Sequence, residues 1–264
     1  YPLRRQRQMC IRDRNENLAK EAATFTETTF IEDLETIVKI SDTLFLTVPD
    51  DLITTVWNQM KDMSLEGKFI CHCSGALSAG DAFPGIDKCG AFGYSVHPLF
   101  AVSDKYNSYK ELSHAYFVIE GDEKHREEIA GIFNNLGNEV RYIAAKDKVK
   151  YHCAAAVCSN HVVALIQESL DLMQECGFDE ESALKALAPI MLGNMQHIAE
   201  RGTVNSLTGP VERADVKTVE KHLNCLDEKQ QMIYRLLSEV LISIGEKKNP
   251  GRDYGRLKHI LGNE

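Results

Sequence analysis

The sequence predicts a two-part α/β protein, in which a domain built on a mostly parallel sheet is followed by an all-helical domain. Up to about residue 145, short apolar runs alternate with helix-like segments over short connections, which is typical of βαβ units. From residue 147 to residue 246, helix-like segments account for nearly the whole sequence, with no convincing strand. We therefore expect one domain over 15–145 and a second over 146–264.

The individual elements follow from apolar periodicity. Thr43 to Val48 is a nearly continuous apolar run, as expected of a parallel strand buried on both faces, and Pro49 ends it. The helix expected at 51–62 carries its apolar residues on one side, and Gly67 precedes the next strand, at 68–75. Further strands are expected at 91–96, 115–119 and 139–143, and further helices at 16–23, 32–42, 76–82, 124–136, 147–176, 179–201, 215–224 and 227–246.

Two of the helices carry specific expectations about packing. The segment 147–176 is apolar almost all round, which predicts a central helix surrounded by others. The segment 227–246 has one apolar stripe and an opposite charged face, so it should pack on one side only.

Composition narrows the class of protein. A net charge of −9 argues against non-specific nucleic-acid binding, which needs a basic surface. No apolar run approaches the roughly 18 residues of a membrane span, and no apolar segment of a signal peptide follows the basic N-terminus. The eight cysteines form no C-x-x-C pair, and a chain of this length needs no disulfides, which favours a reducing, cytoplasmic location.

The first fourteen residues, YPLRRQRQMCIRDR, differ abruptly from the acidic remainder. They contain five arginines and no helix or strand periodicity, and they resemble translated adapter DNA; the alternative is a native basic arm that contacts an anion or a membrane surface. The first glycine is Gly67, and no G-x-G-x-x-G occurs. A dinucleotide site needs such a turn, so we expect residues 1–14 to be non-native and the first strand of the sheet to be missing.

Two motifs stand at the ends of predicted strands, where ligands bind in open α/β sheets. The first is TVPD, with Thr47, Val48 and Pro49; the second is HCSGALS, in which Ser74 and Gly75 form a small turn. Both are also compatible with ordinary strand-to-helix turns.

A zinc site is the other chemistry that this part of the sequence suggests. The candidate ligands are Cys71, His72, Cys73 and His97. Alternation along a strand places Cys71 and Cys73 on one face and His72 on the other, and zinc ligands usually come as spaced pairs from turns, so we expect no metal.

Two further features carry polar side chains suited to catalysis. His97 precedes a proline, which restricts its backbone, and it could act as an acid or donor to a substrate oxygen; a structural histidine bonded to backbone is the alternative. On the long helix, Lys148, His152, Ser159 and Asn160 form a polar row with Tyr151 beside it. Such a row either lines a cleft or makes hydrogen bonds between helices.

The segment LTGPVERAD is the last candidate. Gly209 and Pro210 break the chain, Asp215 could cap the following helix, and Arg213 could bind a carboxylate or phosphate through two hydrogen bonds.

The motifs HCSGALS, HPLFAV, YHCAAAVCSNHVVAL and TGPVERAD, in this order, resemble Rossmann-like proteins with a C-terminal domain of unknown function. That group is similar in turn to pyrroline-5-carboxylate reductase, deazaflavin-dependent NADP reductases and the 6-phosphogluconate dehydrogenase group. The resemblance covers about residues 16–262. It implies that NADP or NAD binds the first domain, that the helical domain forms a homodimer, and that a cleft lies between the domains.

The resemblance also implies roles for individual residues. Thr47, Val48 and Pro49 would lie along the cofactor, with Ser74 and Gly75 near the nicotinamide. The substrate side would be formed by His97, His152, Asn160, Gly209, Pro210 and Arg213, with His97, or the pair His152 and Asn160, as catalytic groups. The function expected is hydride transfer between a nicotinamide and a small imine or carbonyl compound. The alternatives are a non-catalytic dinucleotide-binding sensor and a helical dimerisation scaffold.

Overall fold

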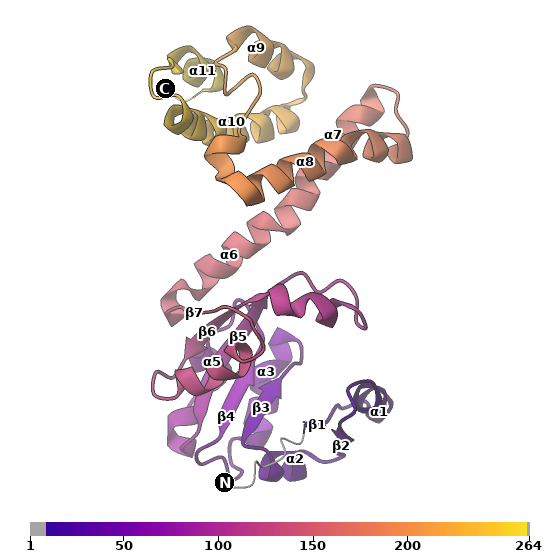
Figure 1. The fold of residues 1–264 in the computed structure, drawn as a ribbon, viewed down its shortest axis with the longest axis vertical. Coiled ribbons are helices and arrows are strands. Elements are labelled where there is room, and N and C mark those ends of the chain that lie inside the picture. The colour runs from indigo at the N-terminus through magenta and orange to yellow at the C-terminus, as the bar shows by residue number, and fades with distance from the viewer. Residues whose placement is uncertain (1–8, 263–264) are drawn as a thin grey trace. The chain divides into compact units, whose positions relative to one another are not determined.

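The computed structural model describes residues 9–262 of the chain, which form two compact units (Figure 1). Unit 1 is Tyr1–His161 and unit 2 is Val162–Glu264. The sequence predicted a division near residue 145, whereas the contacts divide the chain after His161. The difference is the first half of the long helix, which packs with the sheet through side chains described below.

Unit 1 is built around a five-stranded sheet in which strands adjacent in sequence are also adjacent in space. The strands pair in parallel except for β5 and β6, which are antiparallel. The predicted mostly parallel sheet is therefore confirmed. The strands are β3 (Thr43–Leu46), β4 (Phe69–His72), β5 (Phe92–Leu99), β6 (Tyr116–Gly121) and β7 (Val140–Tyr142).

The helices of unit 1 occupy the predicted connections. They are α1 (Glu16–Phe25), α2 (Leu34–Ile40), α3 (Asp50–Met60), α4 (Ala79–Ala82), α5 (Arg126–Asn134) and α6 (Lys148–Cys158), with short 3-10 turns at Ile86–Cys89, Ser108–His114 and Ala145–Asp147.

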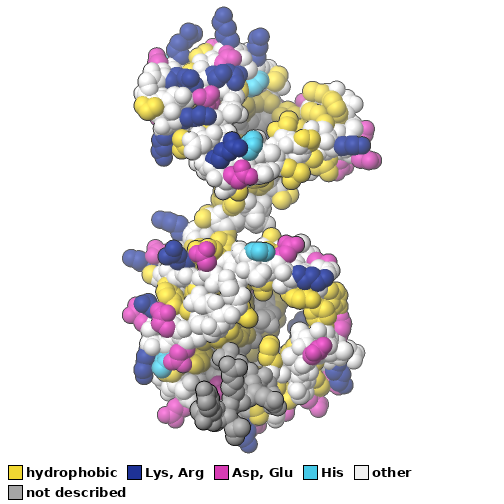
Figure 2. All heavy atoms as spheres, in the orientation of Figure 1, with side chains coloured by type: hydrophobic (Ala, Val, Ile, Leu, Met, Phe, Trp, Pro, Cys, Tyr) yellow, Lys and Arg dark blue, Asp and Glu magenta, His cyan; other side chains and the backbone are white. Residues whose placement is uncertain are grey.

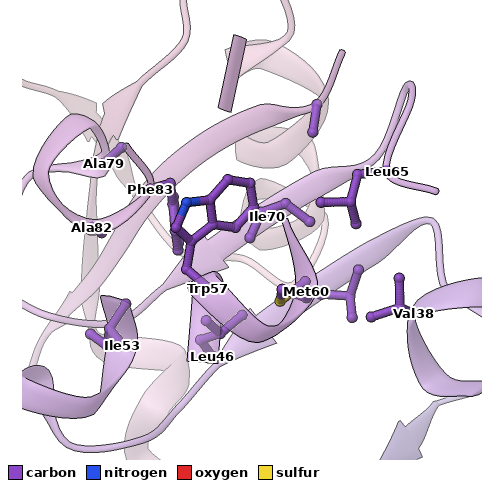
Figure 3. Close-up of a cluster of buried hydrophobic side chains, with 12 residues drawn as sticks. Val38, Leu46, Ile53, Trp57, Met60, Leu65, Ile70, Ala79, Ala82 and Phe83 are labelled. Carbon is purple, nitrogen blue, oxygen red and sulfur yellow. The ribbon is translucent and has the colours of Figure 1, made fainter. Parts of the chain in front are cut away.

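Two apolar cores hold the sheet. One surrounds Trp57 of α3, which is fully buried against Phe83 and Ile70 (Figure 3). The Trp57 indole donates a hydrogen bond to the Pro84 carbonyl at 3.1 Å, so its one polar atom is satisfied. The second core packs α5 on the sheet, with Phe133 stacked on Phe117 at 4.1 Å between ring centroids.

The N-terminal segment contains an element that periodicity did not predict. β1 (Cys10–Ile11) pairs in parallel with β2 (Thr29–Phe30) in a separate two-stranded sheet. Two residues are too few to give a period, and the arginines around them hide the apolar pair. Most of the segment interpreted as non-native, residues 1–8, lies outside the described residues, so that interpretation stays a prediction.

In unit 2 the described residues fold around an apolar core that contains Val219 and Leu223 of α9, Ile242 of α10 and Leu257 of α11. Gly245 admits this packing, because a Cβ there would lie 2.7 Å from the Tyr254 hydroxyl oxygen. Helix α11 was not predicted. The helices are α7 (Asn160–Glu175), which begins in unit 1, α8 (Glu180–Ser206), α9 (Val216–Cys225), α10 (Glu228–Lys248) and α11 (Gly255–Leu261).

The prediction of one surrounded helix over 147–176 was wrong in two respects. The helix breaks at Ser159, whose ψ of −75° is irregular, so α6 and α7 are separate elements. Most of its apolar side chains are also exposed, including Val163 at 71%. By length and composition the segment Ala145–Glu175 could cross a membrane, unlike the expectation from apolar runs alone.

Candidate active site

The site is built where β5 extends beyond the carboxyl end of its neighbour. The pairing between β4 and β5 ends at His72 opposite Ser95, whereas β5 continues to Leu99. Pro98 is tolerated there because its missing N–H faces no β4 partner. Ser95 and His97 are two residues apart, so both side chains leave the same face of this projecting strand.

Helix α6 supplies the partners of both side chains. Lys148 reaches Ser95, and Tyr151 reaches His97. Lys148 and Tyr151 are three residues apart on α6, so their side chains lie on one face of the helix and can reach two side chains on one face of β5. We call the assembled residues the strand-end cluster: Ser74, Gly75, Ser95, His97, Lys148, Tyr151 and His152.

The buried ammonium of Lys148 links the residues of the cluster by hydrogen bonds. Its side chain is buried, with 1% of the residue exposed, and its ammonium donates to the Ser74 carbonyl at 2.9 Å and to the Ser95 hydroxyl at 2.5 Å. Ser95 in turn donates to the same Ser74 carbonyl at 3.0 Å. Burial lowers the pKa of Lys148 to about 8, against the opposing attraction of Glu120 and Asp50.

Glu120 is the buried carboxylate that faces this ammonium. It lies opposite Ser95 in the β5–β6 pairing, so the two side chains share a face. One of its oxygens accepts from the Ala79 backbone N–H at 2.8 Å. Burial raises the pKa of Glu120, and the nearby Lys148 ammonium opposes that rise.

The turn after β4 is fixed by Ser74. Its hydroxyl donates to a carboxylate oxygen of Asp50 at 2.5 Å and accepts from the Leu77 N–H at 3.0 Å. Asp50 opens α3 directly after Pro49. The ends of β3 and β4, which the sequence predicted to share one edge, are therefore joined by a direct hydrogen bond.

In the turn after β4, Gly75 is the residue that the rings of His97 and His152 approach closely. A Cβ at this position would lie 2.5 Å from Cδ2 of His152 and 2.9 Å from Nε2 of His97. No side chain fits there unless both rings move. The imidazoles of His97 and His152 lie 6.2 Å apart between centroids, so they flank the Gly75 backbone.

The side chains of His97 and His72 are both held in the neutral state. Burial, with the Lys148 ammonium as the next cause, lowers the pKa of His97 from 6.5 to about 4, and His152 adds to the effect. The same two causes lower the pKa of His72 to about 4. His72 is fully buried and accepts from the Ser74 N–H through Nδ1 at 3.1 Å.

Within residues 9–262, the hydrogen-bond partner of the His97 side chain is the Tyr151 hydroxyl, 2.8 Å from Nδ1. The two rings meet edge to face. Burial raises the pKa of Tyr151 to about 12, so the phenol keeps its proton at neutral pH.

Comparison with known proteins identifies the region that carries α6. Residues 115–241 match DUF2520, described as a domain of unknown function. The domain runs from β6 into α10, so it includes Glu120, Lys148, Tyr151 and His152 of the site. No curated protein matches the sequence.

Solved structures share the fold of this chain over most of its length. Protein TM1727 from Thermotoga maritima is 27% identical with a TM-score of 0.74, over 89% of this chain and 90% of that chain. An imine reductase from Myxococcus stipitatus in complex with NADP+ is 16% identical with a TM-score of 0.61, over 96% and 91%. A pyrroline-5-carboxylate reductase from Coxiella burnetii is 14% identical with a TM-score of 0.57, over 91% and 87%. The fold is the Rossmann-like fold of dinucleotide-binding oxidoreductases.

The structure brings four of the residues selected from sequence into one place: Ser74, Gly75, His97 and His152. Thr47, Val48 and Pro49 lie between β3 and α3, next to Asp50, which bonds Ser74. Cys71 packs in the core on α5's side of the sheet and His72 packs against Phe83, so the predicted alternation holds.

Other selected residues lie elsewhere in the chain. Asn160 is exposed at the start of α7, where its side-chain oxygen accepts from the Ser159 hydroxyl at 3.0 Å. Gly209, Pro210 and Arg213 belong to unit 2, in the turn before α9. Asp215 caps α9 as predicted, by accepting from the Thr218 N–H. The roles of Asn160 and of this turn stay predictions.

Sequence reasoning missed or underrated four members of the site. Lys148 stood in the polar row, where the resemblance made it a possible counterpart of a lysine used by related dehydrogenases. Tyr151 stood beside it without a role, and Ser95 and Glu120 were not selected at all. The available signal was polarity inside apolar strands: SVHP in β5 and VIEG in β6 each place a polar residue among residues that are otherwise buried.

The residues fit one end of a nicotinamide dinucleotide. The carboxyl ends of β3 and β4 present Pro49 and the Gly75 turn, where a flat ring can approach backbone. A cradle for the diphosphate needs glycine between a strand and a helix, and the described residues before Gly67 contain none. The fit therefore concerns the nicotinamide end.

Proposed function

We propose that this protein is an NAD(P)-dependent oxidoreductase that acts on a small imine or carbonyl compound. The observation that carries the proposal is the convergence of His97, His152 and the Lys148 ammonium on the Gly75 turn, at the carboxyl end of β4. That edge of an open α/β sheet is where ligands bind. The fold shared with solved imine and pyrroline-5-carboxylate reductases supports the same class.

The nicotinamide, when bound, would supply hydride to the carbon of the C=O or C=N group, and the heteroatom would take its proton from solvent water. The chain's own residues position and polarise the substrate. A neutral imidazole is a weak acid, so His97 acts as a hydrogen-bond donor to the heteroatom rather than as a strong acid at neutral pH. Lys148 acts indirectly, because its ammonium is engaged by Ser74 and Ser95.

The proposal is tested first by binding. NADPH and NADH are titrated into the protein while histidine resonances are followed by NMR, and nicotinamide mononucleotide is titrated in parallel because it lacks the adenosine half. We expect NADPH or NADH, and more weakly the mononucleotide, to shift the resonances of His97 and His152 but not that of exposed His114. If saturating amounts of all three leave both rings unshifted, the cofactor assignment fails.

Turnover is tested next with imines, keto acids and alcohols. We expect His97→Asn to lower turnover by about 10²-fold, the lower end of the range for a positioned acid or donor, while cofactor affinity is kept. The matched control is His114→Asn, an exposed histidine in the 3-10 turn before β6. Equal turnover in both variants would remove His97 from the reaction, and binding without any turnover would favour a sensor.

We also propose that the protein forms a homodimer through its helical unit and works in the cytoplasm. Along α8 the side chains of Ile190 and Leu192 are 61% and 69% exposed, and on α10 the side chains of Met232, Leu236 and Val240 are exposed at four-residue spacing. Figure 2 shows hydrophobic side chains gathered on the surface over α7 and α8. Monomers rarely leave large contiguous apolar surfaces open, and a second copy offers a matching surface by symmetry.

The oligomeric state is measured by light scattering after gel filtration. We expect the wild-type protein to elute as a dimer and Leu192→Glu to shift it toward the monomer, with Lys185→Glu on the same helix as the control. A wild-type monomer in detergent-free buffer would contradict the proposal, and partition of the protein into lipid vesicles would assign the exposed apolar helix to a membrane instead.

A further inference from the structure

We propose that Tyr151 is a positioning residue that sets the tautomer of His97. Its hydroxyl donates to Nδ1, so the ring proton resides on Nε2, the atom that faces the Gly75 turn. The inference deepens the proposed function, because it defines which group the substrate must present to the site.

The direction of the hydrogen bond follows from the chemistry of its two groups. A phenol is a better donor than a neutral imidazole N–H, and an imidazole nitrogen lone pair is a better acceptor than a phenol oxygen. In the described part of the chain, Nδ1 of His97 is the one hydrogen-bond partner found for the Tyr151 hydroxyl. If Nδ1 carried the proton instead, the half-buried phenol proton would lack an acceptor, which is costly.

The His97 ring is neutral, so it carries a single proton, on either Nδ1 or Nε2. The charged and titratable groups that act on it are the Lys148 ammonium and the His152 ring on α6 and the Asp50 carboxylate on α3. Burial and the ammonium favour the neutral ring, and the more weakly felt Asp50 opposes them. A neutral imidazole with an occupied Nδ1 can present only an N–H at Nε2.

Nε2 is the free end of the pair. Among the described residues it has no hydrogen-bond partner, and it is the His97 atom nearest to Gly75, 2.9 Å from where a Cβ of residue 75 would stand. An N–H donor at this place needs an acceptor lone pair on the ligand. The site therefore favours a neutral carbonyl oxygen or a neutral imine nitrogen, and disfavours an iminium cation, whose nitrogen has no lone pair and which the nearby ammonium repels.

The tautomer is measured by two-dimensional 15N–1H NMR of protein labelled at histidine nitrogens, in the absence of cofactor and near pH 7. In the wild-type protein we expect Nε2 of His97 to resonate as a protonated nitrogen and Nδ1 as an unprotonated one. In Tyr151→Phe we expect the Nδ1 resonance to shift toward the average of the two tautomers.

The chain offers a matched control in unit 2. There the Tyr234 hydroxyl lies 2.9 Å from Nδ1 of His222, with the same edge-to-face ring geometry as the pair in unit 1. Tyr234→Phe removes the same group from a similar pair, so it should alter the His222 nitrogens and leave those of His97 unchanged.

The outcomes separate this inference from the proposed function. A wild-type His97 with its proton on Nδ1, or on both nitrogens, overturns the inference even if the enzyme is active. This measurement uses the wild-type protein alone, so it does not depend on whether a variant folds. An unchanged His97 spectrum in a folded Tyr151→Phe protein overturns it as well. Where turnover is measurable, Tyr151→Phe should lower kcat by about 10-fold with KM little changed, because binding contacts remain.

Discussion

The ammonium nitrogen of Lys148 lies 2.9 Å from the carbonyl oxygen of Ser74, so α6 is tied by a charge-assisted hydrogen bond to the turn that ends β4. The tie explains why the contacts group α6 with the sheet although its sequence continues into a helical region. It also places a positive charge beneath the Gly75 turn without exposing it.

Replacing this lysine should loosen the whole turn. Lys148→Met removes the donor to Ser74 and Ser95 and leaves Glu120 without its cation, so we expect a loss of about 3 kcal/mol in the free energy of unfolding, measured with urea. Lys150→Met, an exposed lysine on the same helix, is the control and should change stability little.

The double variant Lys148→Met/Glu120→Gln separates the two causes. Since it removes the uncompensated carboxylate, it should recover part of the lost stability. If the loss of stability in the double variant equals the sum of the losses in Lys148→Met and Glu120→Gln, the Lys148 ammonium and Glu120 do not interact.

The contact of Gly75 with two rings gives a second prediction. Gly75→Ala must displace His97 and His152, because the added methyl would stand 2.9 Å or less from both, and we expect a loss of about 1–3 kcal/mol in stability together with shifted resonances of both histidines. Gly80→Ala is the control, since its methyl would meet only the Ser78 hydroxyl at 4.0 Å. Histidine spectra that are unchanged in Gly75→Ala would mean that the rings do not pack on this turn in solution.

The histidines make stability depend on pH in a direction that can be worked out. The pKa of His72 is about 4 in the folded protein and 6.5 in its ordinary state, so between these values the unfolded chain binds the extra proton. Stability therefore falls as the pH drops from about 6.5 toward 4.

His72→Asn isolates this effect, because an asparagine oxygen can still accept from the Ser74 N–H but does not titrate. Between pH 6.5 and 5 we expect the free energy of unfolding of the variant to fall less steeply than that of the wild-type protein. The difference between the two slopes should be at most the slope that corresponds to one bound proton. Parallel curves for the two proteins would show that His72 titrates normally.

The junction of the antiparallel strand pair supplies a prediction about the fold itself. Gly121 ends β6 with φ of 141°, and a Cβ there would lie 2.1 Å from the Gly93 carbonyl oxygen. Gly121→Ala should therefore cost about 3 kcal/mol or more in thermal or urea unfolding. Gly131→Ala in α5, where nothing lies within 4 Å, should be neutral or slightly stabilising; equal effects would place the strain elsewhere.

Periodicity was sufficient for the five strands of the mostly parallel sheet and for the longer helices, because each of them carries its own apolar pattern, but it missed the two-residue strands β1 and β2 and the short helix α11. It located Ser74, Gly75 and His97 through strand-end motifs, which depend on local order alone. It could not find Glu120 or the partner of Ser95, because those contacts join residues 53 apart or pair strands whose antiparallel direction no local pattern encodes. It also misjudged α7, since an apolar helix has the same sequence whether it is covered or exposed.

The break at Ser159 has a consequence for inheritance and engineering. All the members of the strand-end cluster precede it, while the exposed stripes of α8 and α10 follow it. A substitution in these exposed stripes need not touch the cluster, and one that alters the cluster need not change the exposed apolar surface. The two sets of residues can therefore diverge independently among descendants of the same ancestral gene.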